Sequence, residues 1–288
     1  MTLETLSRHA CHGGVLGYYR HRATSTDCEM KFAVFEPPVS ASDAGHSRFP
    51  VLYYLAGLTC TEETFVTKAC ALEHAARLGL MLVAPDTSPR VQLPGDRDSW
   101  DFGAAAGFYL DATQAPWSRH YRMYSYVVDE LPKVVAANFR ADLARSGIMG
   151  HSMGGHGALT IALKNPQRYC SVSAFAPIVA PSQVPWGNKA FSGYLGGERA
   201  SWAQYDACEL VRQGRRFPDS ILVDQGTSDK FLKEQLRPEL LEEACKAAGQ
   251  PLDLRLHSGY DHGYFFIQSF IASHLEWHGR RLLEAAPR

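Results

Sequence analysis

The pentapeptide Gly150-His151-Ser152-Met153-Gly154 constrains the fold of this chain more than any other feature of its sequence. An apolar run precedes it, and a segment of small residues that is typical of a helix start follows it. In a nucleophile elbow, a tight turn between a strand and a helix holds one serine hydroxyl at the end of a sheet. Glycines are needed two residues either side because the serine backbone is strained and the strand and helix approach closely. The pentapeptide therefore predicts a strand, a turn at Ser152 and a helix.

The surroundings of the pentapeptide support this interpretation, although the pattern by itself is a weak signal. Residues 141–149 are typical of a polar turn that leads into a short buried strand. Residues 157–164 are compatible with a helix, and Asn165-Pro166 is a stop signal. A simpler interpretation is a glycine-rich helix start that Ser152 caps. The two interpretations differ in whether the serine has catalytic partners.

Candidate partners lie where two later strands end. A serine hydroxyl becomes nucleophilic when a histidine takes its proton, and an acid must fix the tautomer of that histidine. In α/β-hydrolases the acid and then the histidine follow the serine along the chain. Catalytic groups in open α/β sheets lie beyond the carboxyl ends of the strands. This favours Asp229 over Asp224 and His262 over His257, so that Asp224 and His257 are interpreted as structural.

Two other histidines lie close to the serine in sequence. His151 directly precedes Ser152, so its side chain should diverge from that of the nucleophile. His156 lies one helical turn further on, where side chains share a face. We interpret His156 as a packed or capping histidine.

A tetrahedral intermediate also needs two backbone N–H donors. One normally comes from the residue after the nucleophile, here Met153. The other comes from the loop after an early strand, and residues 51–56 are a strong strand candidate followed by Gly57. A glycine there lets the chain turn so that the N–H of Leu58 faces the serine. Each donor is worth about 3 kcal/mol of barrier lowering.

Nine segments together resemble the S-formylglutathione hydrolase (esterase D) family of thioesterases, in the family's order over roughly residues 15–278. They are residues 55–63 (LAGLTCTEE), 86–90 (DTSPR), 98–103 (DSWDFG), 106–110 (AGFYL), 122–124 (RMY), 150–157 (GHSMGGHG), 185–191 (PWGNKAF), 224–226 (DQG) and 259–262 (GYDH). The resemblance places the family's catalytic triad on Ser152, Asp229 and His262, and its oxyanion donors on Leu58 and Met153.

The resemblance also implies an activity. It implies a serine thioesterase that hydrolyses S-formylglutathione to formate and glutathione through a formyl-serine, with side carboxylesterase activity and no cofactor. The expected partner is a small glutathione thioester. Members of the family often form dimers, so the resemblance also allows a homodimer. The alternatives are a broad short-chain carboxylesterase, an acyltransferase, and a non-catalytic binding protein on the same scaffold.

The substrate pocket is expected to involve Cys60 and Trp186. In the family, a cysteine at the position of Cys60 makes the activity sensitive to thiol reagents. Val91 and Gly263 depart from the family's pattern, where glycine and serine are expected. Five aromatic residues in loop-like stretches could converge on the serine and leave room for only a small acyl group: Trp100, Phe102, Phe108, Tyr109 and Trp186.

Strand-like and helix-like patterns alternate along the chain. We therefore expect an α/β chain with a mostly parallel sheet, helices on both faces, and a single α/β-hydrolase domain over residues 1–288. Pro132 predicts a kink or a helix start. Strands are predicted over residues 30–35, 51–56, 80–84, 147–149, 171–176, 221–223 and 252–257, and helices over 62–78, 124–139, 153–163, 231–248 and 264–283.

Composition excludes several classes of partner. The net charge of −1 argues against nucleic acid and against an anionic membrane surface. Residues 1–15 hold no apolar signal region, and no run is long enough to span a membrane. Seven cysteines without framework spacing suit a reducing compartment, so we expect a cytoplasmic protein. The histidines and cysteines show no metal-binding spacing, so no metal is expected.

Overall fold

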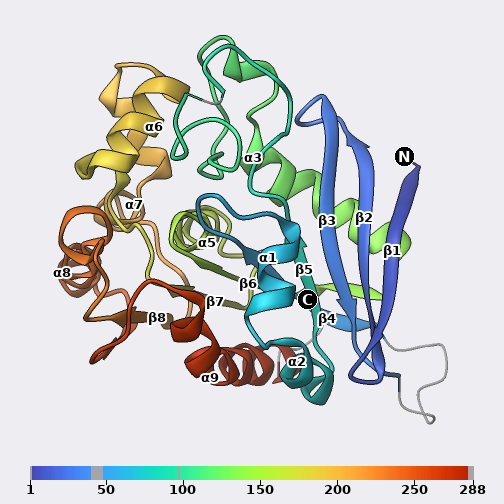
Figure 1. Ribbon diagram of the computed structural model, residues 1–288. Helices are drawn as coiled ribbons and strands as arrows, with labels where there is room; N and C mark the ends of the chain where they lie inside the picture. The colour runs from blue at the N-terminus through green and yellow to red at the C-terminus, as the bar shows by residue number, and fades with distance from the viewer. Residues whose placement is uncertain (1, 40–47, 97, 285–288) are drawn as a thin grey trace.

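The computed structural model describes residues 2–39, 48–96 and 98–284 (Figure 1). Within these ranges, nine strands form one sheet in the order β1-β2-β3-β5-β4-β6-β7-β8-β9. The first three pairings are antiparallel, and β5, β4, β6, β7, β8 and β9 run parallel. The strands are β1 (Leu3–Cys11), β2 (Gly14–Ala23), β3 (Cys28–Glu36), β4 (Phe49–Leu55), β5 (Met81–Pro85), β6 (Ala141–His151), β7 (Ser171–Phe175), β8 (Ile221–Gly226) and β9 (Leu252–His257).

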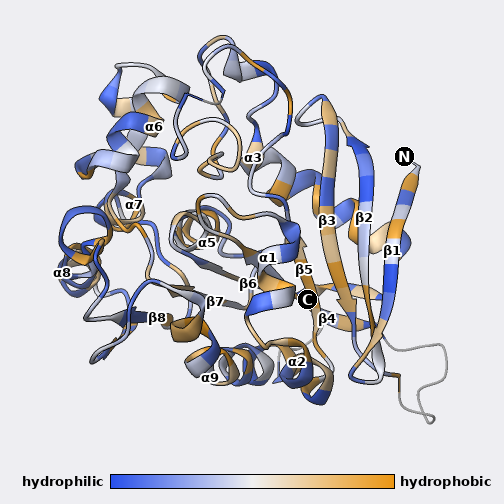
Figure 2. Cartoon of the chain, viewed as in Figure 1, coloured by the Kyte–Doolittle hydropathy of each residue, from blue (hydrophilic) through white to orange (hydrophobic). Residues whose placement is uncertain are grey.

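Helices cover both faces of this sheet, as predicted. Helices α2 and α9 lie side by side against one face, and α5 and α7 lie on the other (Figure 1). The central strands are rich in hydrophobic residues, whereas β1 and β2 carry more hydrophilic ones (Figure 2). The helices are α1 (Glu62–Lys68), α2 (Leu72–Leu78), α3 (Met123–Ser125), α4 (Leu131–Asn138), α5 (Met153–Lys164), α6 (Pro185–Leu195), α7 (Ala207–Arg212), α8 (Pro238–Ala248) and α9 (Tyr264–Glu284).

The structure differs from the sequence-based expectation at the N-terminal end of the chain. The sequence patterns do not predict β1 and β2. Most residues of β1 are exposed because this strand forms an edge of the sheet, so it lacks the alternation of buried and exposed residues that identifies a strand. In contrast, β9 has the predicted bounds.

Three predicted helical segments are divided by local backbone chemistry. The single helix predicted over residues 62–78 is two helices, because Cys70 adopts a left-handed backbone with φ 55°. The helix predicted over 231–248 is interrupted at Arg237, with φ 52°, directly before Pro238 starts α8. In the third, a π-helical turn (Tyr126–Glu130) precedes α4, whose first turn contains Pro132, so the predicted kink or helix start is confirmed.

The segment that leads to the nucleophile elbow is longer than predicted. The polar turn expected in residues 141–149 is part of β6, where the register against β4 shifts between Pro50 and Val51. The shift accommodates residues 143–145 as an irregular bulge, and Ser146 then resumes the pairing. The polar residues therefore lie within a strand, which continues directly to Ser152.

Candidate active site

Ser152 occupies the sharp turn between β6 and α5. Its backbone angles, φ 57° and ψ −118°, lie in a region that costs roughly 1–3 kcal/mol for a residue with a side chain. The turn is held where the N–H of Ser152 donates to the carbonyl of Phe175 at 2.9 Å. A Cβ on Gly154 would lie 1.9 Å from the carbonyl oxygen of Leu55, and one on Gly150 would lie 2.2 Å from that of Gly154. The elbow geometry therefore requires both glycines, as the sequence indicated.

Asp229 and His262 lie beyond the ends of the neighbouring strands β8 and β9, and they form a hydrogen bond. His262 Nδ1 lies 2.6 Å from Asp229 Oδ2. The buried Asp229 carboxylate is held by the N–H of Phe231 on Oδ1 at 2.8 Å and by Gln225 Nε2 on Oδ2 at 3.3 Å. Since an ionised carboxylate only accepts, Nδ1 carries the proton and Nε2 is left able to take one.

The loop after β4 lies directly against the elbow. A Cβ added to Gly57 would lie 3.1 Å from Ser152 Cβ, so this loop and the serine are in contact. Thr59 has φ 68°, and its N–H donates to Ala105 at 3.1 Å. Within the described residues, no hydrogen bond engages the N–H of Leu58. Met153 is the first residue of α5, so its N–H has no partner within the helix. Among the described residues, neither amide N–H is therefore engaged in a hydrogen bond.

The two histidines that flank the serine have different surroundings. The ring of His151 packs against that of His262, with centroids 4.5 Å apart, a contact that the sequence did not suggest. Burial lowers the pKa of His151 well below its ordinary value, and the charge of His262 adds to this effect, so His151 stays neutral. His156 is fully buried with Nε2 3.0 Å from the carbonyl of Phe108, and burial lowers its pKa to about 4. His156 is a packed histidine, as interpreted.

Trp186 belongs to helix α6, so the loop-like assignment of this residue is wrong. The sequence hides this helix because Pro185, Gly187 and Asn188 are typical of loops, yet proline is favoured in a first helical turn. Trp186 is almost buried and packs on Phe231, with ring centroids 4.6 Å apart.

Phe231 is a site residue that sequence reasoning missed. The centroid of its ring lies 5.1 Å from the ring centroid of His262. Nearer the surface, the exposed ring of Trp100 lies edge-on to the ring of Trp186, with ring centroids 5.6 Å apart. We call Trp100, Trp186 and Phe231 the aromatic wall, because together they lead from the surface to His262.

The other aromatic residues anchor loops rather than joining this wall. Phe102 stacks on Tyr194 with centroids 4.5 Å apart, and Phe108 provides the carbonyl that His156 binds. The hydroxyl of Tyr109 donates to the carbonyl of Ala56 at 2.9 Å, just before the loop that carries Leu58.

Cys60 lies two residues beyond Leu58 and is partly buried. Burial raises the pKa of the Cys60 thiol, which lowers its thiolate fraction at neutral pH. Its carbonyl accepts from Thr87 Oγ1 at 2.7 Å and from Arg90 Nη2 at 3.1 Å, which fixes the loop. Neither contact involves Val91, one of the two residues that depart from the family pattern.

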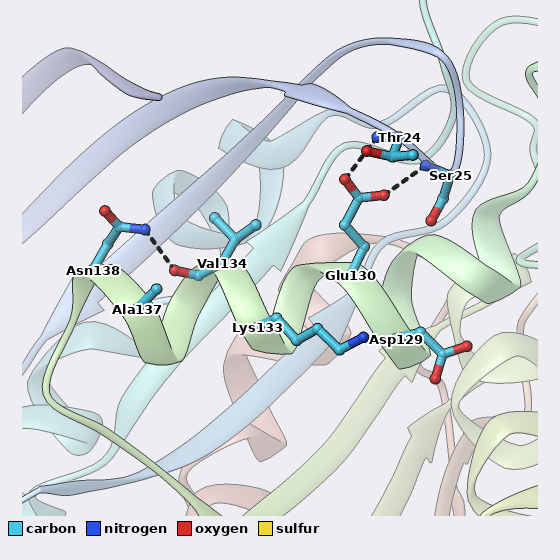
Figure 3. Close-up of a pocket in the computed structure, with 8 residues that line it drawn as sticks. All are labelled: Thr24, Ser25, Asp129, Glu130, Lys133, Val134, Ala137 and Asn138. Carbon is cyan, nitrogen blue, oxygen red and sulfur yellow. Dashed lines mark hydrogen bonds between the residues drawn. The ribbon is translucent and has the colours of Figure 1, made fainter. Parts of the chain in front are cut away.

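Two cavities lie outside this catalytic cluster. A cavity of about 430 Å³ between Arg90 and Trp100 borders the aromatic wall. A hollow of about 370 Å³ between the β2–β3 turn and α4 contains none of the candidate catalytic residues; there, Glu130 accepts from the N–H groups of Thr24 and Ser25 (Figure 3). In residues 2–39, 48–96 and 98–284, no three metal-binding side chains are grouped to hold an ion, and no helix is long and apolar enough to cross a membrane.

The sheet order and the elbow define an α/β-hydrolase. Comparison with known proteins agrees. Residues 23–277 match the model of a family described as "Putative esterase". The chain is 50% identical to the S-formylglutathione hydrolase of Paracoccus denitrificans (strain Pd 1222) over 284 residues, which cover 98% of this chain and 100% of that protein. The chain belongs to this esterase family and, within it, to the S-formylglutathione hydrolases.

Solved structures give the same assignment. The S-formylglutathione hydrolase of Agrobacterium tumefaciens superposes with a TM-score of 0.91 at 50% identity, covering 96% of this chain and 99% of that one. A fluorophosphonate-binding serine hydrolase of Staphylococcus aureus superposes with a TM-score of 0.74 at 17% identity, covering 92% and 98%. The second likeness concerns the fold alone.

Proposed function

We propose that this chain is a serine thioesterase that hydrolyses S-formylglutathione to formate and glutathione, and so acts in formaldehyde detoxification. The observation that carries the proposal is the near-full-length identity of 50% to S-formylglutathione hydrolases. The Asp229–His262 hydrogen bond and the strained elbow at Ser152 support it, because acyl transfer needs these groups.

In the first half of the proposed reaction, Ser152 Oγ attacks the thioester carbonyl carbon while His262 Nε2 takes the hydroxyl proton. The carbonyl oxygen becomes an oxyanion, which the N–H groups of Leu58 and Met153 bind. The C–S bond then breaks, and His262 returns the proton to the departing sulfur, so glutathione leaves as a thiol. Asp229 orients the imidazole and stabilises its cation throughout.

In the second half, water attacks the formyl-serine ester. His262 again takes the proton, now from water, and gives it to Ser152 Oγ when the ester bond breaks. The products are formic acid, which ionises to formate and a proton released to solvent, and free enzyme, so atoms and charge balance without a cofactor.

The test compares kcat/KM for S-formylglutathione and for p-nitrophenyl acetate, with Ser152→Ala as the control. We expect a preference of several orders of magnitude for the thioester. Equal values would indicate a general short-chain esterase instead. Removal of the serine should lower both rates by at least about 10³-fold, and a variant that kept its turnover would exclude Ser152 as the nucleophile.

We propose a cytoplasmic location for this activity. None of the seven cysteines, all of which lie in the described residues, forms a disulfide, as expected under reducing conditions. Cell fractionation followed by activity measurement would test this.

A further inference from the structure

A second aspartate–histidine group lies buried within the fold, and the proposed mechanism does not use it. Asp224 on β8 is fully buried, and its Oδ2 lies 3.1 Å from His257 Nε2 and 3.4 Å from His274 Nε2. His257 is the last residue of β9, and His274 is a fully buried residue of α9. One carboxylate oxygen therefore faces ring nitrogens from two different elements.

The contacts continue from His274 into the core. His274 Nδ1 lies 2.9 Å from Ser173 Oγ, which lies 2.8 Å from His278 Nε2. His278 Nδ1 in turn lies 2.6 Å from Ser171 Oγ. Three strands and one helix thus share a single line of polar atoms.

Asp224 meets the two rings at ion-pair distance without the alignment of a hydrogen bond, and the hydrogen-bonded line itself runs from His274 Nδ1 to Ser171. A carboxylate attracts the positive end of an N–H group, so we place the ring protons of His257 and His274 on Nε2, the nitrogens that face Asp224. Burial lowers the pKa of His274, and that of His278 well below its ordinary value, so both rings are neutral. His274 Nδ1 must then accept from Ser173, which accepts from Nε2–H of His278. Each atom in the hydrogen bonds from His274 Nδ1 to Ser171 then has one consistent role.

These contacts hold both sides of the segment that carries His262. The chain leaves the sheet at His257, passes through His262, and enters α9 at Tyr264. The stretch before His262 is tied to Asp224 through His257, and the helix after it is tied to Asp224 through His274. Rotation of either element would therefore move His262 relative to the elbow.

The same strand also supports the acid. Gln225, the neighbour of Asp224 on β8, donates to Asp229 Oδ2 at 3.3 Å. Successive side chains of a strand point to opposite faces, so β8 presents Asp224 to α9 and Gln225 to Asp229. Both groups of the Asp229–His262 pair thus depend on the placement of this part of β8.

We propose that Asp224 is a positioning residue for His262, acting through its contacts with His257 and His274. The inference rests on the proposed role of His262 as general base. Asp224 touches no substrate atom and takes no part in proton transfer to Ser152. It sets the geometry from which His262 reaches the serine.

The test uses two substitutions of His257 that separate its N–H from its ring. His257 stacks on Phe270 with centroids 3.7 Å apart. His257→Phe keeps an aromatic ring for this stacking and removes the N–H that faces Asp224. His257→Gln removes the ring and keeps an N–H donor. Asp224→Asn, which loses the charge but keeps the shape, is the third variant.

We expect kcat of His257→Phe to fall about tenfold for both S-formylglutathione and p-nitrophenyl acetate with KM little changed, because a displacement of about 1 Å can cost up to 10²-fold. His257→Gln should stay within about twofold of the wild type. Rates are measured below the unfolding transition of each variant and divided by the concentration of titrated active sites. Loss of stability alone would not change kcat measured in this way.

A spectroscopic measurement provides the second readout. Proton NMR should show the Nδ1–H of the Asp229–His262 hydrogen bond shifted or broadened in His257→Phe and Asp224→Asn and unchanged in His257→Gln. Wild-type kcat in His257→Phe, or equal losses in the Phe and Gln variants, would overturn the proposal. His262→Ala tests the proposed function separately from the positioning role of Asp224. If this variant kept full activity, the proposed function would fail whatever the His257 variants did.

Discussion

The burial of His156 predicts how stability depends on pH. This histidine lies at the start of α5 with its ring fully buried between Phe108 and Phe191. Nε2 donates to the carbonyl of Phe108, while Nδ1 is buried without a hydrogen-bond partner among the described residues. Protonation of Nδ1 would place a cation there with no acceptor. A change from pH 8 to pH 5 should therefore destabilise the wild type more than His156→Gln.

The magnitude follows from the lowered pKa. Burial lowers the pKa of His156 from 6.5 to about 4. Between these values the unfolded chain binds more protons than the folded one, so the free energy of unfolding falls as the pH falls. The contribution of neutral His156 to the free energy of unfolding is fully present above pH 6.5. It is smaller by about 2 kcal/mol at pH 5 and by about 3.4 kcal/mol below pH 4. His151 and His278, whose pKa values are also well below the ordinary value, add losses of the same sign.

Urea unfolding at pH 8 and pH 5 measures this contribution. The glutamine can still donate to the carbonyl of Phe108 but cannot titrate, so His156→Gln should lose about 2 kcal/mol less than the wild type between the two pH values. Any packing defect of the variant cancels, because only the difference between pH values is compared. The exposed His9, changed to Gln, is the matched control and should leave the wild-type difference unaltered. Equal pH-dependent losses in the wild type and His156→Gln would refute the reasoning.

Three further outcomes are expected. Gly154→Ala should lower the free energy of unfolding by at least about 1–3 kcal/mol, because its Cβ would collide with the carbonyl of Leu55, whereas Gly197→Ala, with open space around it, should be nearly neutral in the same urea titration. Inactivation by iodoacetamide should accelerate as the pH rises, because burial raises the pKa of the Cys60 thiol. Cys60→Ser should abolish the inactivation, whereas Cys70→Ser, at an exposed cysteine, should not. Phe231→Ala should lower kcat for both substrates in steady-state assays, because its ring supports His262.

Patterns that depend on local physics were predictable from the sequence. The elbow was predictable because glycine is the residue that fits where a strand and a helix approach to within contact distance, as at Gly154. Position beyond a strand end was enough to select Asp229 and His262, which the structure brings together. The contacts of His151 and Phe231 with His262 were not predictable, because they join segments far apart in the sequence. Helix α6 was missed because Pro185 and Gly187 signal loops unless the packing around them is known.

The two aspartate–histidine pairs show why position decides function here. Asp224 and His257 lie on β8 and β9, and Asp229 and His262 lie five residues further along the chain, in the loops that follow the same two strands. Their side chains are equally buried, with both aspartates at 0% and both histidines at 18% exposure. Burial and pairing therefore cannot separate them.

What separates the pairs is the neighbour of each histidine. The ring of His257 stacks on Phe270, a residue of α9, and so faces the helix that covers the sheet. The ring of His262 packs on His151, the residue directly before Ser152, and so lies at the elbow. Asp229 lies three residues beyond the end of β8, and His262 lies five residues beyond the end of β9. This displacement along the chain is enough to move the same chemical pair from the interior of the fold to the edge of the sheet, where a substrate can be bound.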